Sequence, residues 1–425
     1  MFFLCLEGLF MTVDVIYAPF EGVIPNEMFA NLVVALPYDV LSSLEAKELA
    51  KDNPYSFLHV SKAEIDFEDQ IDIYDEKVYL KASENFRNLL TNAVLHNVYK
   101  PCFYVYRMVE KNNRMQTGIV VSASVKAYLE GRIKRHELTR VVKEDDRVNQ
   151  IKAVGAQTGP ALLINKPIQK VKDLLNRITN NKELFGVEDI NGVKHSLWLV
   201  DNDEDIKCLM EEFSKQNCAY IADGHHRSAA AARIAKEYDM VDDARFLAVA
   251  FFEDEMNILD YNRVVYDLNG LSKEEFLANL VKEFDVVKEE FRRPSQKGEF
   301  AMYLDKEWYS LQYKGQPLGN DPVSCLDVSI LSQKVLDELL GIKDLRNSMR
   351  IDFIGGIRGE KEIEKRVDEC NGVGFMLYPT RVKELLDVAD NDMLMPPKST
   401  WFEPKLLDGM VSMAIDEKKK TLKCA

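Results

Sequence analysis

The sequence YIADGHHRSAAAA, residues 220–232, decides the fold of this chain. Its first three residues are apolar and predict a buried strand, while the run of Ser and Ala from Ser228 onward predicts a helix over residues 227–238. Gly224 stands between these elements, where it permits a sharp turn and a close approach of the backbone to a ligand. The stretch therefore predicts a strand, a tight turn and a helix that packs closely through its alanines.

The turn itself has the chemistry of an anion site. The first N–H groups of a helix lack partners within the helix, and together with the macrodipole they attract anions. Arg227 adds a planar fork suited to phosphate or carboxylate, and two adjacent histidines can transfer protons near neutral pH. Histidines are often packed or surface residues, but two of the chain's six histidines stand together here, directly after Asp-Gly. We predict His225 and His226 as catalytic, and as phosphate-binding the residues Asp223, Gly224, Arg227 and Ser228.

Helix and strand patterns alternate along the chain, which predicts a mixed α/β fold with α/β or α+β layers. The character of the sequence changes near residues 293–297, where two strand patterns are followed by a helix-rich part. We therefore expect a catalytic core at residues 12–293 and a C-terminal α/β region at 294–425. Residues 1–11 are apolar but lack the basic start of a signal peptide. An extension ahead of Met11, an N-terminal strand and a helix are all open readings of them.

Composition narrows the class of protein. The net charge of −15 and the pI near 5.1 argue against nucleic-acid binding, which needs a basic surface. No stretch reaches the roughly 18 apolar residues of a membrane span. The seven cysteines are odd in number and include no C-x-x-C pair, which fits reduced thiols rather than disulfides or zinc. We expect a cytoplasmic protein with small-molecule partners and neither nucleic acid nor membrane; the oligomeric state stays open.

Asp39 is a second candidate for chemistry. Residues 31–36 (NLVVAL) predict a buried strand that ends at Pro37-Tyr38-Asp39, and Ser42 or Ser43 then caps a helix over residues 44–50. A carboxylate between such elements can lie at a cleft, where it could deprotonate a substrate hydroxyl or hold Mg²⁺. Alternatively, an aspartate in such a turn simply accepts bonds from the backbone.

Two further segments could contribute to the site. Residues 131–149 are the one locally basic block of an acidic chain, and they could bind a triphosphate or phosphoserine or form a solvated loop. In this block we predict Glu137 as a base or metal ligand, and as phosphate-binding His136, Thr139 and Arg147. The proline-stiffened loop MPPKSTW, residues 395–401, is a rigid mount for donors or a structural turn. The predicted substrate-binding residues are Tyr38, Lys398, Ser399, Thr400 and Lys405.

The Asp-Gly-His-His-Arg turn resembles that of the ParB/sulfiredoxin superfamily, which includes archaeal free serine kinases and holds nucleotide phosphates with this unit. The chain after Met11 is similar as a whole to the family known as domain of unknown function 1015. The matching segments are Pro37-Tyr38-Asp39-Val40 with Ser42, Asn53-Pro54, Tyr104-Val105-Tyr106, Gly131 with His136-Glu137-Leu138-Thr139 and Asp146-Arg147, Ala222-Asp223-Gly224-His225-His226-Arg227, and Pro396-Pro397-Lys398-Ser399-Thr400 with Phe402, Pro404 and Lys405.

The resemblance implies a ParB/sulfiredoxin-like nucleotide-binding core with an N-terminal extension. His225 stands where sulfiredoxin has its reactive cysteine, and no helix-turn-helix reader is evident, so neither sulfinic-acid chemistry nor DNA reading is supported. The serine kinase branch points to serine or phosphoserine, with ATP or ADP and Mg²⁺ as cofactors. We expect a phosphotransferase that acts between a nucleotide and serine or phosphoserine, in either direction. A phosphoserine phosphatase-type hydrolase and a ParB-like nucleotide-binding regulator are the alternatives.

Overall fold

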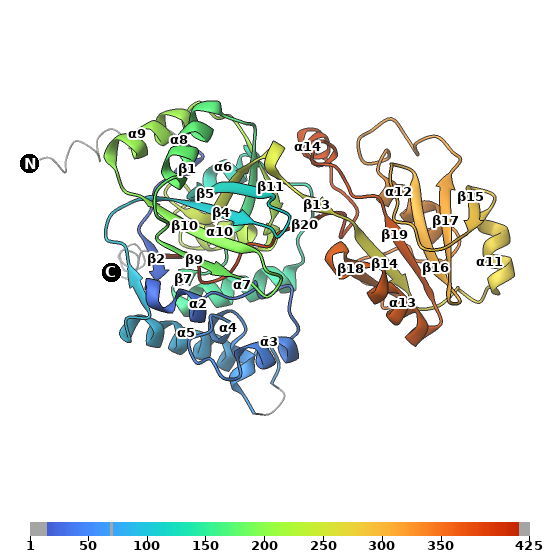
Figure 1. Ribbon diagram of the computed structural model, residues 1–425, viewed down its shortest axis with the longest axis horizontal. Coiled ribbons are helices and arrows are strands. Elements are labelled where there is room, and N and C mark those ends of the chain that lie inside the picture. Colours follow the sequence, from blue (N-terminus) through green and yellow to red (C-terminus); the bar gives the residue numbers. More distant parts are fainter. Residues whose placement is uncertain (1–14, 69–70, 416–425) are drawn as a thin grey trace, which may run out of the picture. The chain divides into compact units, whose positions relative to one another are not determined.

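A computed structural model describes residues 15–68 and 71–415, so the expectations for residues 1–11 lie outside the described residues (Figure 1). The chain forms two compact units. Unit 1 contains the chain up to Lys134, Thr139–Met256 and the chain from Pro404 onward, and unit 2 contains Arg135–Leu138 and Asn257–Glu403. Both units combine helices with sheets, so the predicted mixed α/β class is confirmed.

The two units divide the chain differently from the predicted ranges 12–293 and 294–425. Strands β14 (Tyr261–Val265) and β15 (Phe284–Lys288) come before residue 293 but pair with strands of unit 2. Strand β21 (Ser412–Ala414) comes near the end of the described chain and pairs with a strand of unit 1. Long-range strand pairing therefore decides the division, and local composition does not record such pairing.

Among the described residues, unit 1 is built around a nine-stranded sheet with the order β6-β11-β8-β12-β5-β4-β10-β9, to which β1 is added through β5. Its strands are β1 (Tyr17–Ala18), β4 (Phe103–Val109), β5 (Met115–Ser124), β6 (Ile133–Lys134), β8 (Ala161–Asn165), β9 (Phe185–Glu188), β10 (Lys194–Val200), β11 (Ala219–Asp223) and β12 (Arg245–Phe252). Strand β11 is antiparallel to β8, whereas β12 is parallel to β8. The sheet is therefore mixed, and β11 lies near one edge of it.

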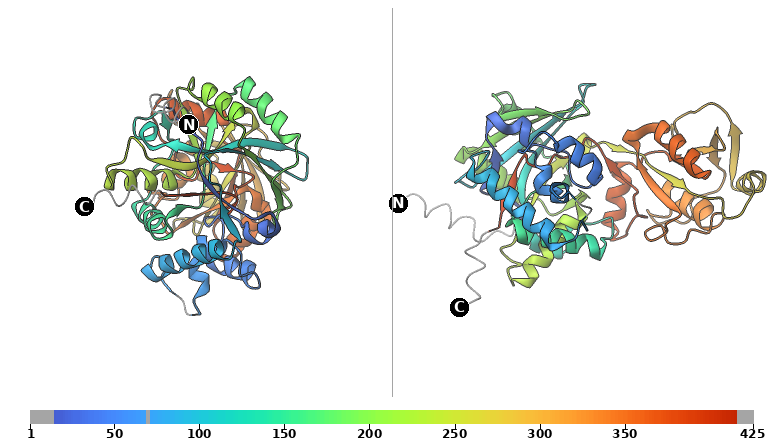
Figure 2. Two further views of the ribbon diagram at one scale, coloured as in Figure 1. Left: turned by 90° about the vertical axis from the view of Figure 1, so that its left-hand side faces the viewer. Right: turned by 90° about the horizontal axis from the view of Figure 1, so that it is seen from below.

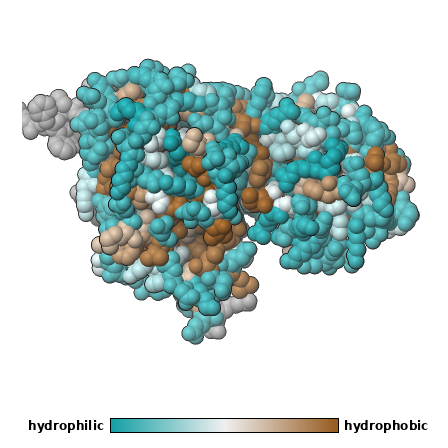
Figure 3. Space-filling view, in the orientation of Figure 1, coloured by the Kyte–Doolittle hydropathy of each residue, from teal (hydrophilic) through white to brown (hydrophobic). Residues whose placement is uncertain are grey.

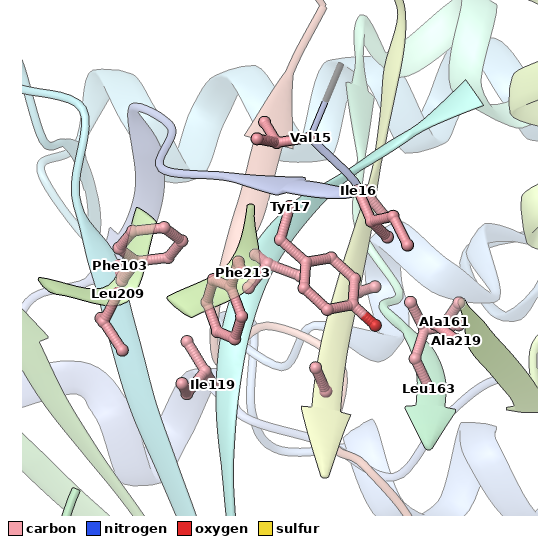
Figure 4. Packing of buried hydrophobic residues seen from close by; sticks show 14 of the residues in the cluster. Val15, Ile16, Tyr17, Phe103, Ile119, Ala161, Leu163, Leu209, Phe213 and Ala219 are labelled. Carbon is pink, nitrogen blue, oxygen red and sulfur yellow. The ribbon is translucent and has the colours of Figure 1, made fainter. Parts of the chain in front are cut away.

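One face of this sheet is covered by the helices α8 (Gln169–Thr179), α9 (Asp203–Phe213) and α10 (His225–Glu237). Alternate strand residues such as Phe103 and Ile119 point to this face, as strand geometry requires, and share a core with Leu209. The rings of Tyr17 and Phe213 meet edge-on in the same core, with 5.2 Å between their centroids (Figure 4). This packing holds α10, which begins at the predicted turn, against the sheet.

The opposite face of the sheet contacts the segments around Gly22 and Leu407. The N–H of Gly22 donates to Tyr104 Oη at 3.0 Å, and the N–H of Leu407 donates to Tyr106 Oη at 3.3 Å. Gly22 is the first residue of β2 (Gly22–Pro25). This strand belongs to a four-stranded sheet with β3 (Leu95–Asn97), β7 (Ala156–Gln157) and β21. Tyr104 of β4 thereby holds the segment around Gly22 against the sheet, and Tyr106 holds the segment around Leu407, which is distant in the sequence.

Helices from the first part of the chain form a layer of their own, drawn in blue in Figures 1 and 2: α3 (Ser43–Ala50), α4 (Leu58–Ser61) and α5 (Glu76–Thr91). The predicted capping box of α3 is present, with Ser42 and Glu45 bonded to each other's backbone. Helix α7 (Val141–Val154) connects this layer to α10, because it packs against α5 and places Val148 beside Ala230. Residues 141–149, the second half of the basic block, therefore lie in a helix that packs against α10.

Unit 2 has its own antiparallel sheet, with the order β15-β17-β16-β19-β14-β18. Its strands besides β14 and β15 are β16 (Glu299–Leu304), β17 (Glu307–Tyr313), β18 (Ile351–Gly355) and β19 (Val373–Leu377), and its helices are α11 (Lys273–Leu280), α12 (Asp327–Leu331), α13 (Gly359–Cys370) and α14 (Val382–Asp390). Ile363 of α13 packs against Val264 and Ala301 of the sheet. The short strands β13 (Ile258–Leu259) and β20 (Trp401–Phe402) pair at the two ends of this unit's chain.

The strand predicted over residues 31–36 is wrong. The structure has helix α2 (Ala30–Val33) there, and Ala30 and Val33 are buried while Leu32 is 43% exposed. Buried residues three positions apart fit the periodicity of a helix. The sequence did not reveal this spacing, because the neighbouring residues are apolar as well. Around the turn the prediction is confirmed, since β11 and α10 cover the expected strand and helix.

The surface is largely polar. The face drawn in Figure 3 is mostly hydrophilic, in keeping with the 29% of charged residues in the sequence. Over residues 15–68 and 71–415, no helix combines the length and the apolar character needed to cross a bilayer.

Candidate anion-binding site

The site begins at the turn between β11 and α10. Gly224 has φ 91° and ψ 26°, a left-handed conformation that glycine adopts at no steric cost. A Cβ at this position would lie 2.9 Å from Ala161 Cα, so the turn also runs closer to β8 than a side chain allows. Ser228, which was predicted to bind phosphate, is fully buried and donates from Oγ to Gly224 O at 3.2 Å. Its hydroxyl therefore braces the turn.

Asp223 closes the turn from the strand side. Its Oδ1 accepts a hydrogen bond from the N–H of Gly224 at 2.7 Å, and its Oδ2 accepts one from Lys405 Nζ at 3.1 Å. Burial alone would raise the pKa of this carboxyl, but Lys405 and Arg227 outweigh burial and hold the pKa well below its usual range. Asp223 is thus ionised at all physiological pH values, and its role is to anchor cationic side chains.

Arg227 is the cation at the centre of the site. Its Nη2 lies 3.6 Å from Asp223 Oδ1 and 3.8 Å from Asp39 Oδ2, and its Nη1 donates to the carbonyl of Pro160. Burial lowers the pKa of the guanidinium, but Asp39 and Asp223 raise it by more, so the group stays charged. The structure therefore brings Asp39 to the turn, as the sequence predicted.

A second guanidinium comes from α7. Arg147 Cζ lies 3.8 Å from the centroid of the Tyr38 ring, and its Nε and Nη2 donate to Asp146 Oδ2 at 3.1 and 2.8 Å. Tyr79 Oη donates to the other oxygen of Asp146 at 3.1 Å, which fixes the pair. Burial raises the pKa of the Tyr38 hydroxyl to about 12, although Arg147 opposes the shift. Cation–π stacking and the ion pair hold Arg147 in one orientation.

Both guanidiniums line one pocket of unit 1. The pocket has about 380 Å³ of unfilled space, part of which is open to solvent. Its polar lining comprises Tyr38, Ser61, Arg147, Gln150, Gln157, Thr158, Arg227 and Asp408. Asp408 was not predicted from the sequence. It is 1% exposed, and burial raises the pKa of its carboxyl to about 7 against the opposing effects of Arg227 and Arg147. Two guanidiniums and a buried carboxyl therefore line one small pocket.

The two histidines of the turn have different surroundings. His225 is buried at the first position of α10, with 5% of its surface exposed. His226 is partly exposed, and its Nε2 accepts a hydrogen bond from the N–H of Arg140 at 3.0 Å. Because Nε2 acts as an acceptor, the neutral ring of His226 carries its proton on Nδ1. His226 therefore links the turn to the chain just before α7.

Several predicted residues bond to other groups or belong to unit 2. Thr139 belongs to unit 1, but its hydroxyl donates to Glu144. The residues His136, Glu137, Lys398, Ser399 and Thr400 all belong to unit 2. There the carbonyl of His136 accepts from the N–H of Met395 at 2.8 Å, and the hydroxyl of Ser399 donates to the carbonyl of Pro396 at 2.6 Å. Their roles as base, phosphate ligands or substrate ligands stay predictions.

The predicted Mg²⁺ finds a poor ligand in Asp39. Its carboxylate lies 3.8 Å from the Arg227 guanidinium, and a divalent cation at the same oxygen would be repelled by that charge. Asp39 therefore fits a proton acceptor beside a cation better than a metal ligand. Mg²⁺ at Glu137 stays a prediction.

Comparisons with known proteins give a family and only weak structural likenesses. The profile of the family described as "Protein of unknown function (DUF1015)" matches residues 17–329. A mutant of free serine kinase in complex with AMP is 15% identical, with a TM-score of 0.37 over 71% of this chain and 93% of that chain. SbnI with a C-terminal truncation, from Staphylococcus aureus, is 12% identical, with a TM-score of 0.38 over 71% and 92%. At these TM-scores the likenesses carry no argument about function, and no curated protein matches the chain significantly.

Proposed function

The chain belongs to the family of proteins of unknown function DUF1015, and from the site just described we propose that it is a phosphotransferase acting between a nucleotide and serine or phosphoserine. The observation that carries the proposal is the pocket into which Arg147 and Arg227 both project, beside Tyr38 and Asp39. Phosphoryl transfer depends mainly on positioning and on charge stabilisation, and fixed guanidiniums supply both.

The roles of the residues follow from their surroundings. Arg227 and Arg147 hold the oxygens of the phosphoryl group, assisted by the N-terminus of α10. Asp223 and Lys405 hold the turn in shape through their bond of 3.1 Å. Asp39, whose side chain is 38% exposed, is accessible to a substrate hydroxyl, and its Oδ2 lies 3.8 Å from Arg227 Nη2 beside the phosphate site.

In the kinase direction, the hydroxyl oxygen of serine attacks the terminal phosphorus of ATP. The bond between that phosphorus and the bridging oxygen of ADP breaks, and Asp39 takes the hydroxyl proton. In the opposite direction ADP receives the phosphoryl group of phosphoserine, and Asp39 returns the proton to the serine oxygen. Serine as the acceptor rests on the sequence resemblance, whereas the anion site rests on the two arginines.

The assay offers the protein phosphoserine with ADP, and separately serine with ATP, each with and without Mg²⁺. The expected products are ATP and serine in the first reaction and ADP and phosphoserine in the second. Free phosphate without ATP would instead identify a phosphatase in which water is the acceptor. A complete lack of turnover with all four mixtures would contradict the proposal.

A pair of variants on α10 tests the site itself. Arg227→Met removes a guanidinium of the pocket and is expected to lower turnover about a hundredfold. Arg233→Met is the matched control, because Arg233 is on the same helix but pairs with Glu144 and Asp145 outside the pocket lining. Thermal unfolding of both variants separates loss of function from loss of fold. If the two variants were equally active, Arg227 would have no specific role in turnover.

A further inference from the structure

Asp408 has a carboxyl oxygen that the protein itself does not satisfy. The side chain is 1% exposed and lines the pocket, and its Oδ1 has no hydrogen-bond partner among the described residues. The backbone of Tyr38 is close enough to the carboxyl to lower its pKa. A buried polar atom without a partner costs free energy, so such an atom at a pocket wall indicates a group that completes its bonding from the pocket.

The backbone around Asp408 is fixed, so the oxygen cannot simply turn away. Asp408 and Ala35 exchange two backbone hydrogen bonds of 2.9 and 3.1 Å, and the neighbouring N–H of Leu407 donates to Tyr106 Oη. Gly159 leaves the space beside the carboxyl open, because a Cβ there would lie 3.0 Å from Asp408 Oδ1 and 3.6 Å from Arg227 Cδ. The carboxyl and a guanidinium thus face the same narrow space.

The charges around the pocket bear on the ionisation of this carboxyl. The cations near it are Arg147, Arg227 and Lys405, and the carboxylates paired with them are Asp39, Asp146 and Asp223. These six charges balance, so an ionised Asp408 gives the cluster a net negative charge. An anion that enters the pocket would meet this extra charge at close range, whereas a protonated Asp408 leaves the two guanidiniums available.

We propose that Asp408 is a ligand-binding residue that acts in its protonated form, donating a hydrogen bond from Oδ1 to a tetrahedral oxyanion held by Arg147 and Arg227. The proposal rests on the anion site of the proposed function but not on the identity of the substrate. It agrees with the environment of Asp408, because burial and Asp39 raise the pKa of the carboxyl to about 7 while Arg227 and Arg147 oppose the rise. A proton is therefore available at neutral pH.

The competing arrangement is an ionised Asp408 that accepts a hydrogen bond from a cationic group of the ligand. Asp408→Asn separates the two, because asparagine has the shape of a protonated aspartate. Its amide oxygen can take the place of one carboxyl oxygen, and its NH₂ group can donate into the pocket. The substitution preserves binding if Asp408 is a donor, and it weakens binding if Asp408 is a charged acceptor.

The experiment measures sulfate binding by calorimetry between pH 6 and pH 8. Sulfate mimics a phosphoryl group but does not titrate in this range, so any proton taken up belongs to the protein. If binding requires a proton on a group with a pKa of about 7, the dissociation constant of the wild type rises about tenfold from pH 6 to pH 8. In two buffers with different ionisation enthalpies at pH 7, about half a proton is taken up per sulfate bound.

Two variants decide the assignment. Asp408→Asn is expected to bind sulfate at pH 8 as tightly as the wild type does at pH 6, with less than about twofold pH dependence. Asp327→Asn is the matched control. Asp327 of unit 2 is also buried, has an oxygen without a partner among the described residues, and has a pKa that burial raises to about 6. Unlike Asp408, it does not line the pocket. This control should keep the tenfold dependence.

The proposal is overturned if the wild type does not bind sulfate at pH 6, or binds it without proton uptake. It is also overturned if Asp408→Asn keeps the pH dependence of the wild type, since another group would then take the proton. The wild-type measurement decides the matter even if the variant fails to fold. Sulfate binding requires no turnover, so it tests the proposal for Asp408 even if the phosphotransfer assay shows no activity.

Discussion

Gly224→Ala is the substitution that most directly tests the structure of the turn. At φ 91° an alanine lies in the left-handed region, which costs about 1–2 kcal/mol. Its Cβ would also lie 2.9 Å from Ala161 Cα and 3.1 Å from Ala161 Cβ. The first of these atoms belongs to the backbone of β8, which cannot move without disturbing the sheet, so overpacking adds about 1–3 kcal/mol. The expected loss of unfolding free energy is therefore about 2–5 kcal/mol.

Gly131→Ala separates the two costs. Gly131 has φ 78°, but a Cβ there meets no atom within 4 Å, so only the conformational cost of about 1–2 kcal/mol applies. Urea unfolding with an unchanged m-value measures both losses. The difference between the variants reports the contact of the turn with β8. Equal losses in the two variants would refute the close approach that holds Asp223 and Arg227 in place.

Three further experiments probe the charges of the site. Asp408→Asn should raise the unfolding free energy at pH 8 by up to about 4 kcal/mol and leave it unchanged near pH 4. The reason is that the raised pKa of the buried carboxyl costs the wild type stability as the pH rises from about 4 to about 7. Urea unfolding at several pH values measures the effect, and a difference that does not change with pH would contradict it. Lys405→Met should cost about 1–3 kcal/mol at pH 7, since it removes a partner of Asp223. The loss should shrink at acid pH, because the carboxyl of the variant lacks one of the cations that lower its pKa and so takes up a proton at a higher pH than that of the wild type. Arg147→Lys and Tyr38→Leu should show a coupling of about 0.5–2 kcal/mol in a double-mutant cycle, and additive losses would contradict the stacking.

The local parts of the site could be predicted from sequence because their causes are local. A glycine between an apolar strand and a helix of small residues marks a turn whatever surrounds it, and β11, Gly224 and α10 have the expected form. Arg227 was predicted to bind an anion because its planar guanidinium follows the turn directly. Asp39 and Arg147 were predicted separately, and the structure brings both to the pocket or its edge.

The rest of the site depends on contacts between distant parts of the chain. Asp408 is 181 residues from Arg227 (408 minus 227), and it reaches the pocket because Tyr106 and Ala35 bind the backbone beside it. Nothing in its neighbourhood of the sequence distinguishes it from an aspartate in a surface turn. The hydroxyl of Ser228 was assigned to phosphate because hydroxyls at helix starts often bind anions, but in this turn the helix backbone uses it.

An acidic protein can hold an anion site because electrostatic screening separates the pocket from the surface. At physiological salt the Debye length is about 8 Å, so most of the net charge of −15 acts weakly on a ligand already between Arg147 and Arg227. A long polyanion extends over the acidic surface and is repelled along its length, whereas a single phosphoryl group interacts only with the pocket. The carboxylates paired with the two guanidiniums then prevent the site from binding anions indiscriminately. A buried carboxyl that carries a proton at neutral pH adds a directed donor without adding charge, and this favours a tetrahedral oxyanion that accepts a hydrogen bond over anions that cannot accept one from that direction.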